Sequence, residues 1–166
     1  MVEAQTELTA KIVKFLEEIG LTVRLETIEG ETFLPGLRIE RGAMVVDDEQ
    51  LLYPGDLLHE AGHLAVMTSE ERAASDGNVG PDAGAEMAAM AWSYAAALAI
   101  GIDPRVVFHE HGYKGGGAQL AEGYASGRNV GVPLLAWYGL TDDPLFGGVP
   151  RTGEWAFPRM RKWLRS

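Results

Sequence analysis

The chain has 166 residues, of which 46% are hydrophobic and 23% are charged, and a chain of this size and composition builds a single globular domain with its own core. Its formal net charge is −10, which repels nucleic-acid backbones and anionic membrane surfaces and argues against both as partners. The absence of cysteine excludes disulfides and thiolate ligands, so a metal site here would use nitrogen and oxygen donors.

The first predicted elements are a helix and a small sheet. Apolar residues recur at helical spacing over residues 6–19, and Gly20 supplies a stop. Short alternating runs over residues 21–28 and 37–47, the second interrupted by an Arg-Gly turn, predict a small, mostly antiparallel sheet. The N-terminus "MVEAQTELTAKIVKF" lacks the apolar stretch and cleavage site of a secretory signal, so we expect a cytoplasmic protein.

Two longer helices are predicted next. Asp56 is expected to be the N-cap of a helix that runs to about Met67. A polar segment, either a loop or a loop with one short helix, leads to a second helix that Asp82 caps and Gly101 ends. The second helix is alanine-rich and apolar nearly all round, but Glu86 interrupts it, which favours a buried core helix over a membrane span.

The remainder of the chain is expected to be less regular. A short helix is predicted over residues 118–126. Residues 127–166 are rich in proline and glycine and predict a largely irregular wrap over the core, ending in a short amphipathic helix over residues 159–165. No linker or repeat is visible, so residues 1–166 are expected to form one α+β domain in which the N-terminal helix and the sheet pack on the two longer helices.

The stretch "HEAGH", residues 59–63, carries the chemistry. In a helix, His59 and His63 lie on one face about 5 to 6 Å apart, so both can reach one zinc ion at roughly 2.0 to 2.1 Å. Glu60 is rotated by about 100° from His59, which leaves its carboxylate beside the metal as a general base. The alternative is a pair of half-buried histidines that bond to their neighbours.

A catalytic zinc takes three protein ligands and keeps one position open, so a third ligand is needed. The candidates are Asp76, Asp82, Glu86, His109 and His111. Glu86 is preferred because it is the one charged residue inside a long apolar helix, where burying an unpaired carboxylate would cost several kcal/mol. An exposed position near the start of that helix is the alternative.

Four further residues could assist hydrolysis at such a zinc site. His109 and His111 follow a predicted helix and could donate a hydrogen bond to the oxyanion of a tetrahedral intermediate. Tyr94 and Tyr113 are equally plausible as donors, or as hydrogen-bond partners that orient a metal ligand. For His109 and His111, the alternative interpretation as surface histidines in a loop is equally good.

With "HEAGH" at residues 59–63 and "EMAAMAWSYAAALAI" from Glu86 onwards, the layout resembles the zincin metallopeptidases of the gluzincin type. It is more closely similar to the ImmA/IrrE-type minimal metallopeptidases of bacteria, over roughly residues 11–100. The resemblance implies a minimal zincin-like domain that binds zinc through His59, His63 and Glu86, uses Glu60 as base, and cleaves a regulatory protein such as a repressor.

We therefore expect a zinc-dependent metallopeptidase that hydrolyses peptide bonds in a peptide or protein substrate, and the resemblance implies one specific regulatory protein as that substrate. The alternative is a zinc-stabilised binding or regulatory protein that does no chemistry. A closed site with a fourth protein ligand, supplied by His109 or His111, would favour that alternative.

Overall fold

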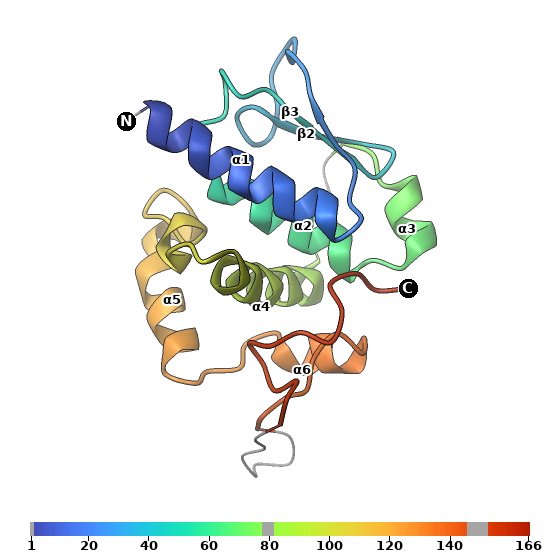
Figure 1. Cartoon of the computed structure of the whole chain (residues 1–166), viewed down its shortest axis with the longest axis vertical. Coiled ribbons are helices and arrows are strands. Elements are labelled where there is room, and N and C mark those ends of the chain that lie inside the picture. The colour runs from blue at the N-terminus through green and yellow to red at the C-terminus, as the bar shows by residue number, and fades with distance from the viewer. Residues whose placement is uncertain (1, 78–81, 146–152) are drawn as a thin grey trace.

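The structure, a computed structural model, describes residues 2–77, 82–145 and 153–166 (Figure 1). It is an α+β fold, as expected. In chain order its elements are α1 (Val2–Glu18), β1 (Val23–Leu25), β2 (Leu37–Glu40), β3 (Ala43–Val46), α2 (Gly55–Val66), α3 (Ser69–Ala74), α4 (Ala83–Ile100), two short 3₁₀ turns, η1 (Pro104–Val106) and η2 (Tyr113–Gly115), α5 (Gly117–Ala125) and α6 (Val132–Trp137).

The sheet has the order β1-β3-β2 and is half parallel. Strand β2 runs antiparallel to β3 because a two-residue turn, Arg41–Gly42, joins them with positive φ angles of 49° and 78°. Strand β1 runs parallel to β3, so the expected mostly antiparallel sheet is wrong for this pair. The chain over residues 26–36 crosses to the far edge of the sheet before β2 begins, which leaves β3, and not β2, beside β1.

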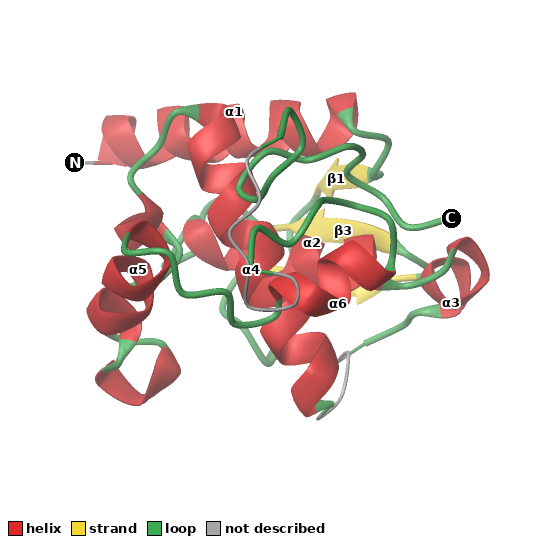
Figure 2. Cartoon of the chain, turned by 90° about the horizontal axis from the view of Figure 1, so that it is seen from below, coloured by secondary structure: helices red, strands yellow, loops and turns green. Residues whose placement is uncertain are grey.

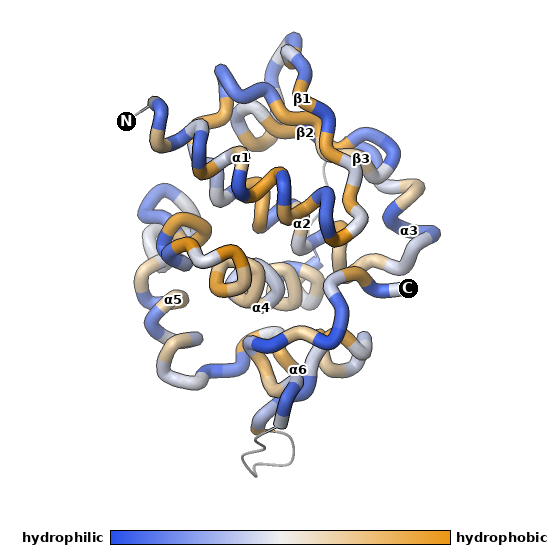
Figure 3. Tube along the Cα trace, in the orientation of Figure 1, coloured by the Kyte–Doolittle hydropathy of each residue, from blue (hydrophilic) through white to orange (hydrophobic). Residues whose placement is uncertain are grey.

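The helices form the body of the molecule below the sheet (Figure 1). Helices α2 and α4 pack against each other, and α1 contacts both. Figure 2 shows α5 and α3 at opposite ends of this helical layer. The largest fully buried side chains include Trp92, Phe108, Ile12, Leu58 and Met44, so α1, the sheet, α2 and α4 share one core. In Figure 3, hydrophobic and hydrophilic residues alternate along α1, as its amphipathic spacing predicts.

Helix α4 is the buried, alanine-rich helix that was expected. The Asp82 carboxylate accepts a hydrogen bond from Ala85 N at 2.9 Å, and Gly101 ends the helix in the left-handed conformation with φ 83°. Among the described residues, no helix has both the length and the apolar character needed to cross a membrane.

Among the described residues between α2 and α4, the chain forms one short helix, α3, which is one of the two expected alternatives, and residues 78–81 of the expected loop lie outside the described residues. Thr68 and Glu71 form a capping box at its start. In the same region, the side chain of Arg72 bonds to Leu64 O at 2.8 Å and to Met67 O at 3.0 Å. These two carbonyl groups lie at the C-terminal end of α2, where helix carbonyls have no partner inside the helix.

The last forty residues differ from the expectation in two ways. Helix α6 forms within them, and residues 159–165 are not helical. A seven-residue helix is too short to offset the cost of nucleation by itself. Here the backbone instead finds partners across the fold, since Arg161 N bonds to Leu140 O at 2.8 Å and Arg165 N to Ala65 O at 2.9 Å. In the described residues 127–145 and 153–166 the chain is irregular outside α6 and has no terminal helix, and residues 146–152 of the expected wrap lie outside the described residues.

Candidate metal centre

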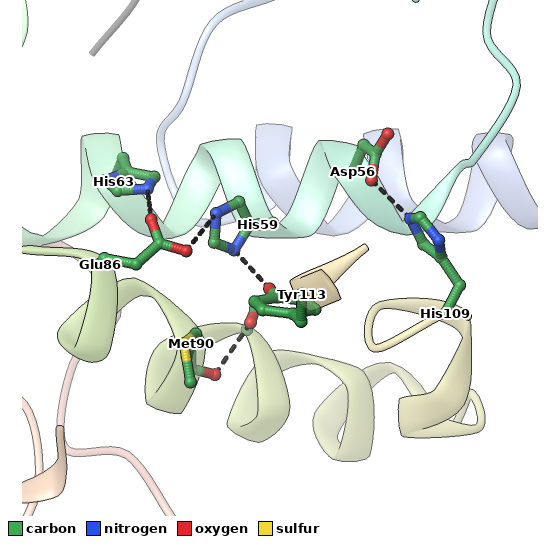
Figure 4. A network of polar contacts seen from close by, with 8 residues as sticks. Asp56, His59, His63, Glu86, Met90, His109 and Tyr113 are labelled. Carbon is green, nitrogen blue, oxygen red and sulfur yellow. Dashed lines mark hydrogen bonds and ion pairs between the residues drawn. The ribbon is translucent and has the colours of Figure 1, made fainter. Parts of the chain in front are cut away.

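His59 and His63 on α2 meet Glu86 on α4 (Figure 4). The distance from His59 Nε2 to Glu86 Oε1 is 3.2 Å, and that from His63 Nε2 to Glu86 Oε2 is 2.9 Å. His63 is buried and His59 is nearly so, whereas 43% of the Glu86 side chain is exposed. These three residues form a cluster that could hold a metal ion, with one donor atom from each lying within 4.8 Å of the others.

Gly62 allows the two helices to approach closely enough for this meeting. A Cβ atom at Gly62 would lie 2.8 Å from Ala89 O and 3.1 Å from Ala89 Cα, so any side chain there would collide with the backbone of α4. Glu86 precedes Ala89 by one helical turn on the same face. The close contact at Gly62 therefore sets the distance between the carboxylate and the two histidines.

The donor atoms are close enough to share one metal ion. Two ligand atoms that each lie about 2.05 Å from an ion are roughly 3.3 Å apart in a tetrahedral site, and the two histidine nitrogens lie 3.2 and 2.9 Å from Oε1 and Oε2 of Glu86 respectively. Hydrogen bonds from His59 and His63 hold the pKa of Glu86 well below its usual value, so its carboxylate is ionised, as a metal ligand must be.

Tyr113 contacts Nδ1 of the His59 ring, the ring nitrogen that does not face Glu86. Its hydroxyl group lies 2.8 Å from His59 Nδ1, so Nε2 is the nitrogen that points at Glu86 (Figure 4). Burial raises the pKa of Tyr113, which keeps it a neutral phenol that can either donate or accept this bond. A partner on the second nitrogen fixes the orientation and tautomer of a ligating histidine.

Tyr94, the other tyrosine expected near the site, lies elsewhere. Its ring stacks on Tyr124 at 4.9 Å and contacts Phe108 at 6.5 Å. Both partners belong to the core beside α5. Tyr94 therefore packs the core and has no bond to the three clustered residues.

His109 and His111 do not join the cluster. His109 Nε2 lies 2.9 Å from Asp56 Oδ1, and its ring stacks on Tyr53 at 4.2 Å, while His111 is exposed beside Glu110. This pairing also corrects the expected role of Asp56. Its carboxylate caps no helix, because α2 begins one residue earlier with Pro54 at the N-cap position, and it instead fastens the chain after η1 to the start of α2.

The other two acidic candidates for the third ligand also stay outside the cluster. Asp82 caps α4 through its bond to Ala85 N. Asp76 is exposed. Of the five candidates, Glu86 alone lies with the two histidines.

Glu60 is buried, with only 8% of its surface exposed. Burial raises the pKa of its carboxyl group, against the opposing effect of the nearby His63 and His59. Its Oε1 atom is buried and has no hydrogen-bond partner among the described residues. A polar atom left in this condition costs free energy, and such atoms are found where a ligand or a reacting group completes the site.

Sequence reasoning did not find the cavity next to Glu60. It has a volume of about 180 Å³, and the segment before β2, the strand itself and Gly77 form its walls. Its side chains come from a loop and an edge strand with no recognisable motif, so no local pattern could have revealed it.

The chain was compared with known protein families, with curated proteins and with solved structures, and none of them matches it. The chemistry open to this site therefore follows from its own donor atoms and their geometry.

Proposed function

We propose that this protein is a zinc-dependent metallopeptidase that hydrolyses peptide bonds. The observation that carries the proposal is Glu60, a buried carboxyl group with an unpartnered oxygen that lies on α2 between His59 and His63, two of the three residues of the cluster. A site that bound zinc for stability alone would not need a buried base next to its ligands.

The residues would divide the reaction between them. Zinc held by His59, His63 and Glu86 would supply a Lewis acid, which acidifies a water molecule and polarises a carbonyl group. Glu60 takes one proton from that water as the oxygen bonds to the carbonyl carbon, and its raised pKa suits it to hold that proton. It would then pass this proton to the leaving nitrogen as the carbon–nitrogen bond breaks, which yields a carboxylic acid and an amine. The second proton of the water then moves from the acid to the amine at neutral pH and gives a carboxylate and an ammonium group.

The donor set favours catalysis over a closed structural site. Within the described parts of the chain, the cluster offers three ligands and neither His109 nor His111 adds a fourth. Three protein ligands and an open position are typical of catalytic zinc. A zinc-stabilised protein without activity is the alternative function, and the experiment below distinguishes it.

The resemblance to ImmA/IrrE-type metallopeptidases supports a regulatory protein in the cytoplasm as the substrate. The net charge of −10 disfavours nucleic acid and anionic membranes as direct partners. It would also attract a basic substrate at low salt.

The first measurement is metal content. Protein purified without chelators should contain about one zinc ion per chain, and zinc added to the metal-free protein should raise its melting temperature. Glu86→Gln should lower zinc affinity at least tenfold, whereas Glu122→Gln, an exposed carboxylate on α5, should not. Equal zinc affinity in the two variants would remove Glu86 from the site.

The second measurement is turnover with a mixture of unstructured peptides, followed by mass spectrometry. Glu60→Gln should keep its zinc and lose about 10²- to 10⁴-fold in rate. A native protein that binds zinc and cleaves no peptide in the mixture would favour the non-catalytic alternative. A Glu60→Gln variant as active as the native protein would contradict the mechanism.

A further inference from the structure

A small apolar cavity adjoins Glu60. It has a volume of about 180 Å³ and is lined mainly by Phe33, Leu34, Leu37 and Ile39, and its charged residues are Glu31, Glu60 and Arg38. Phe33 is 78% exposed, so the cavity has an apolar rim open to solvent. Its size is too small for a drug-sized ligand, which needs roughly 300 Å³ or more, but a cavity of about 150 Å³ with aliphatic walls accepts a benzene ring.

Glu60 connects this cavity to the candidate metal centre. It lines the cavity, and on α2 it directly follows His59 and precedes His63 by three residues. A side chain that fills the cavity would therefore belong to a residue beside the bond on which Glu60 acts.

Strand β2 forms one wall and is an edge strand of the sheet, but part of its outer edge is already bonded. Leu37 N bonds to Leu34 O at 3.2 Å, and Ile39 O accepts a bond from Gly77 N at 2.8 Å. A peptide that added to this edge as a new strand would find these two backbone groups occupied. Selectivity at this place must therefore come mainly from a side chain in the cavity.

We propose that this cavity is the specificity pocket of the enzyme, and that it accepts one uncharged apolar side chain of about the size of leucine or phenylalanine, next to the cleaved bond. This rests on the proposed peptidase function. Glu31 and Glu60 disfavour an acidic side chain in the pocket, and the apolar walls disfavour a basic one, because its charge would lose water there. Because the other walls are apolar, an uncharged polar side chain would lose hydrogen bonds to water without replacement.

Substrate preference tests the proposal. In matched peptides that differ at one residue, phenylalanine or leucine beside the cleaved bond should raise kcat/KM at least tenfold over alanine or aspartate. Leu34→Trp should fill the pocket and reduce that preference at least tenfold. Leu52→Trp, at an exposed leucine outside the pocket, should leave the preference unchanged. A native enzyme without preference would overturn the proposal.

Binding without turnover separates this proposal from the proposed function. Acetyl-phenylalaninamide should shift the methyl NMR signals of Leu34, Leu37 and Ile39 in the zinc-treated native protein, and acetyl-aspartamide should not. Shifts with no hydrolysis of any peptide would keep the pocket and reject the peptidase. Hydrolysis without shifts and without apolar preference would keep the peptidase and reject the pocket, and the absence of both would reject both.

Discussion

The carboxyl group of Glu60 lies in an energetically unfavourable environment within the candidate site. Its carboxyl group is buried beside another carboxylate, Glu86, and one of its oxygens has no partner in the described structure. Both burial and the charge of Glu86 raise its pKa, although burial has the larger effect. Under the proposed function, Glu60 is kept at this cost for its reactivity.

Replacing Glu60 with glutamine should therefore stabilise the metal-free protein at neutral pH. The folded-state pKa of Glu60 lies above its ordinary value of 4.5, so as the pH rises the unfolded chain loses this proton first and the folded state becomes less stable. Glutamine has no proton to lose. The gain of Glu60→Gln should appear as the pH rises above about 4.5 and vanish below about pH 4.

Urea unfolding of the metal-free variants at pH 4 and pH 7 measures this. Glu122→Gln, an exposed change of the same kind, should alter the free energy of unfolding by less than about 0.5 kcal/mol at both values. If Glu60→Gln gave the same small change at both pH values, Glu60 would not be a buried carboxyl group with a raised pKa.

Tyr113 should affect zinc affinity without touching the ion. Tyr113→Phe removes the partner of His59 Nδ1, and loss of such a partner usually lowers metal affinity about 10- to 100-fold. Tyr124→Phe is the matched control, because its hydroxyl bonds to Val130 O at 2.8 Å and not to a member of the cluster. Competition with a zinc-binding dye measures both. Equal affinities in the two variants would show that Tyr113 does not orient His59.

The meeting of His59 and His63 could be predicted from sequence because a helix places residues four apart on one face, whereas the role of Glu60 stays a prediction. Glu86 joins the two histidines as predicted, but it lies in the first turn of α4 with 43% of its side chain exposed, so the argument from the cost of a buried carboxylate does not hold. By contrast, four residues were equally good candidates for an assisting role, and the structure brings only Tyr113 to His59. Tyr113 lies in an irregular segment where side-chain directions follow from tertiary contacts, so no spacing rule could have selected it.

At the scale of elements, α2 and α4 make the site by packing closely. The pair was predictable from helical periodicity and from the start and stop signals at Asp82 and Gly101. The sheet was not, because strands of three or four residues contain too little pattern to show which of them pair. The same limit hid the cavity beside β2, which depends on the pairing order.

Gly62 should be the residue that controls the distance between α2 and α4. A methyl group there would meet backbone atoms of Ala89 at 2.8 and 3.1 Å, and backbone cannot move aside without displacing α4. We expect Gly62→Ala to destabilise the fold by about 1 to 3 kcal/mol, despite the higher helix propensity of alanine, and to lower zinc affinity at least tenfold by shifting Glu86.

Gly84→Ala provides the control within α4. A methyl group there would lie 3.3 Å from Asp82 Oδ1 and 3.9 Å from a Leu134 side-chain atom, and both are side-chain atoms that can adjust. This variant should keep native zinc affinity and a native or slightly higher free energy of unfolding. A Gly62→Ala protein as stable and as tight a zinc binder as Gly84→Ala would refute the role of the close helix contact.

At the scale of the whole molecule, the C-terminal segment packs against α1 and against α2 and α4, the two helices that carry the candidate site. Trp163 packs edge-on against Phe15 of α1 at 5.0 Å and against Trp92 of α4 at 5.6 Å. Trp163 O accepts a hydrogen bond from Trp92 Nε1 at 2.9 Å. Further along, Arg165 N bonds to Ala65 O near the end of α2. Because this segment contacts α1, α2 and α4, it holds together α2 and α4, the two helices that carry the candidate metal centre.

Trp163→Ala should therefore destabilise the whole fold, whereas Trp137→Ala should not. Removing the Trp163 ring loses two aromatic contacts and leaves a gap between α1 and α4, which should cost about 2 to 4 kcal/mol. Trp137 on α6 is 84% exposed, so the same truncation there should change the free energy of unfolding by less than about 0.5 kcal/mol. Circular dichroism at increasing urea concentration measures both variants without relying on tryptophan fluorescence. Equal midpoints for the two would mean that the C-terminal segment lies on the core without stabilising it, and zinc affinity in Trp163→Ala would then be native as well.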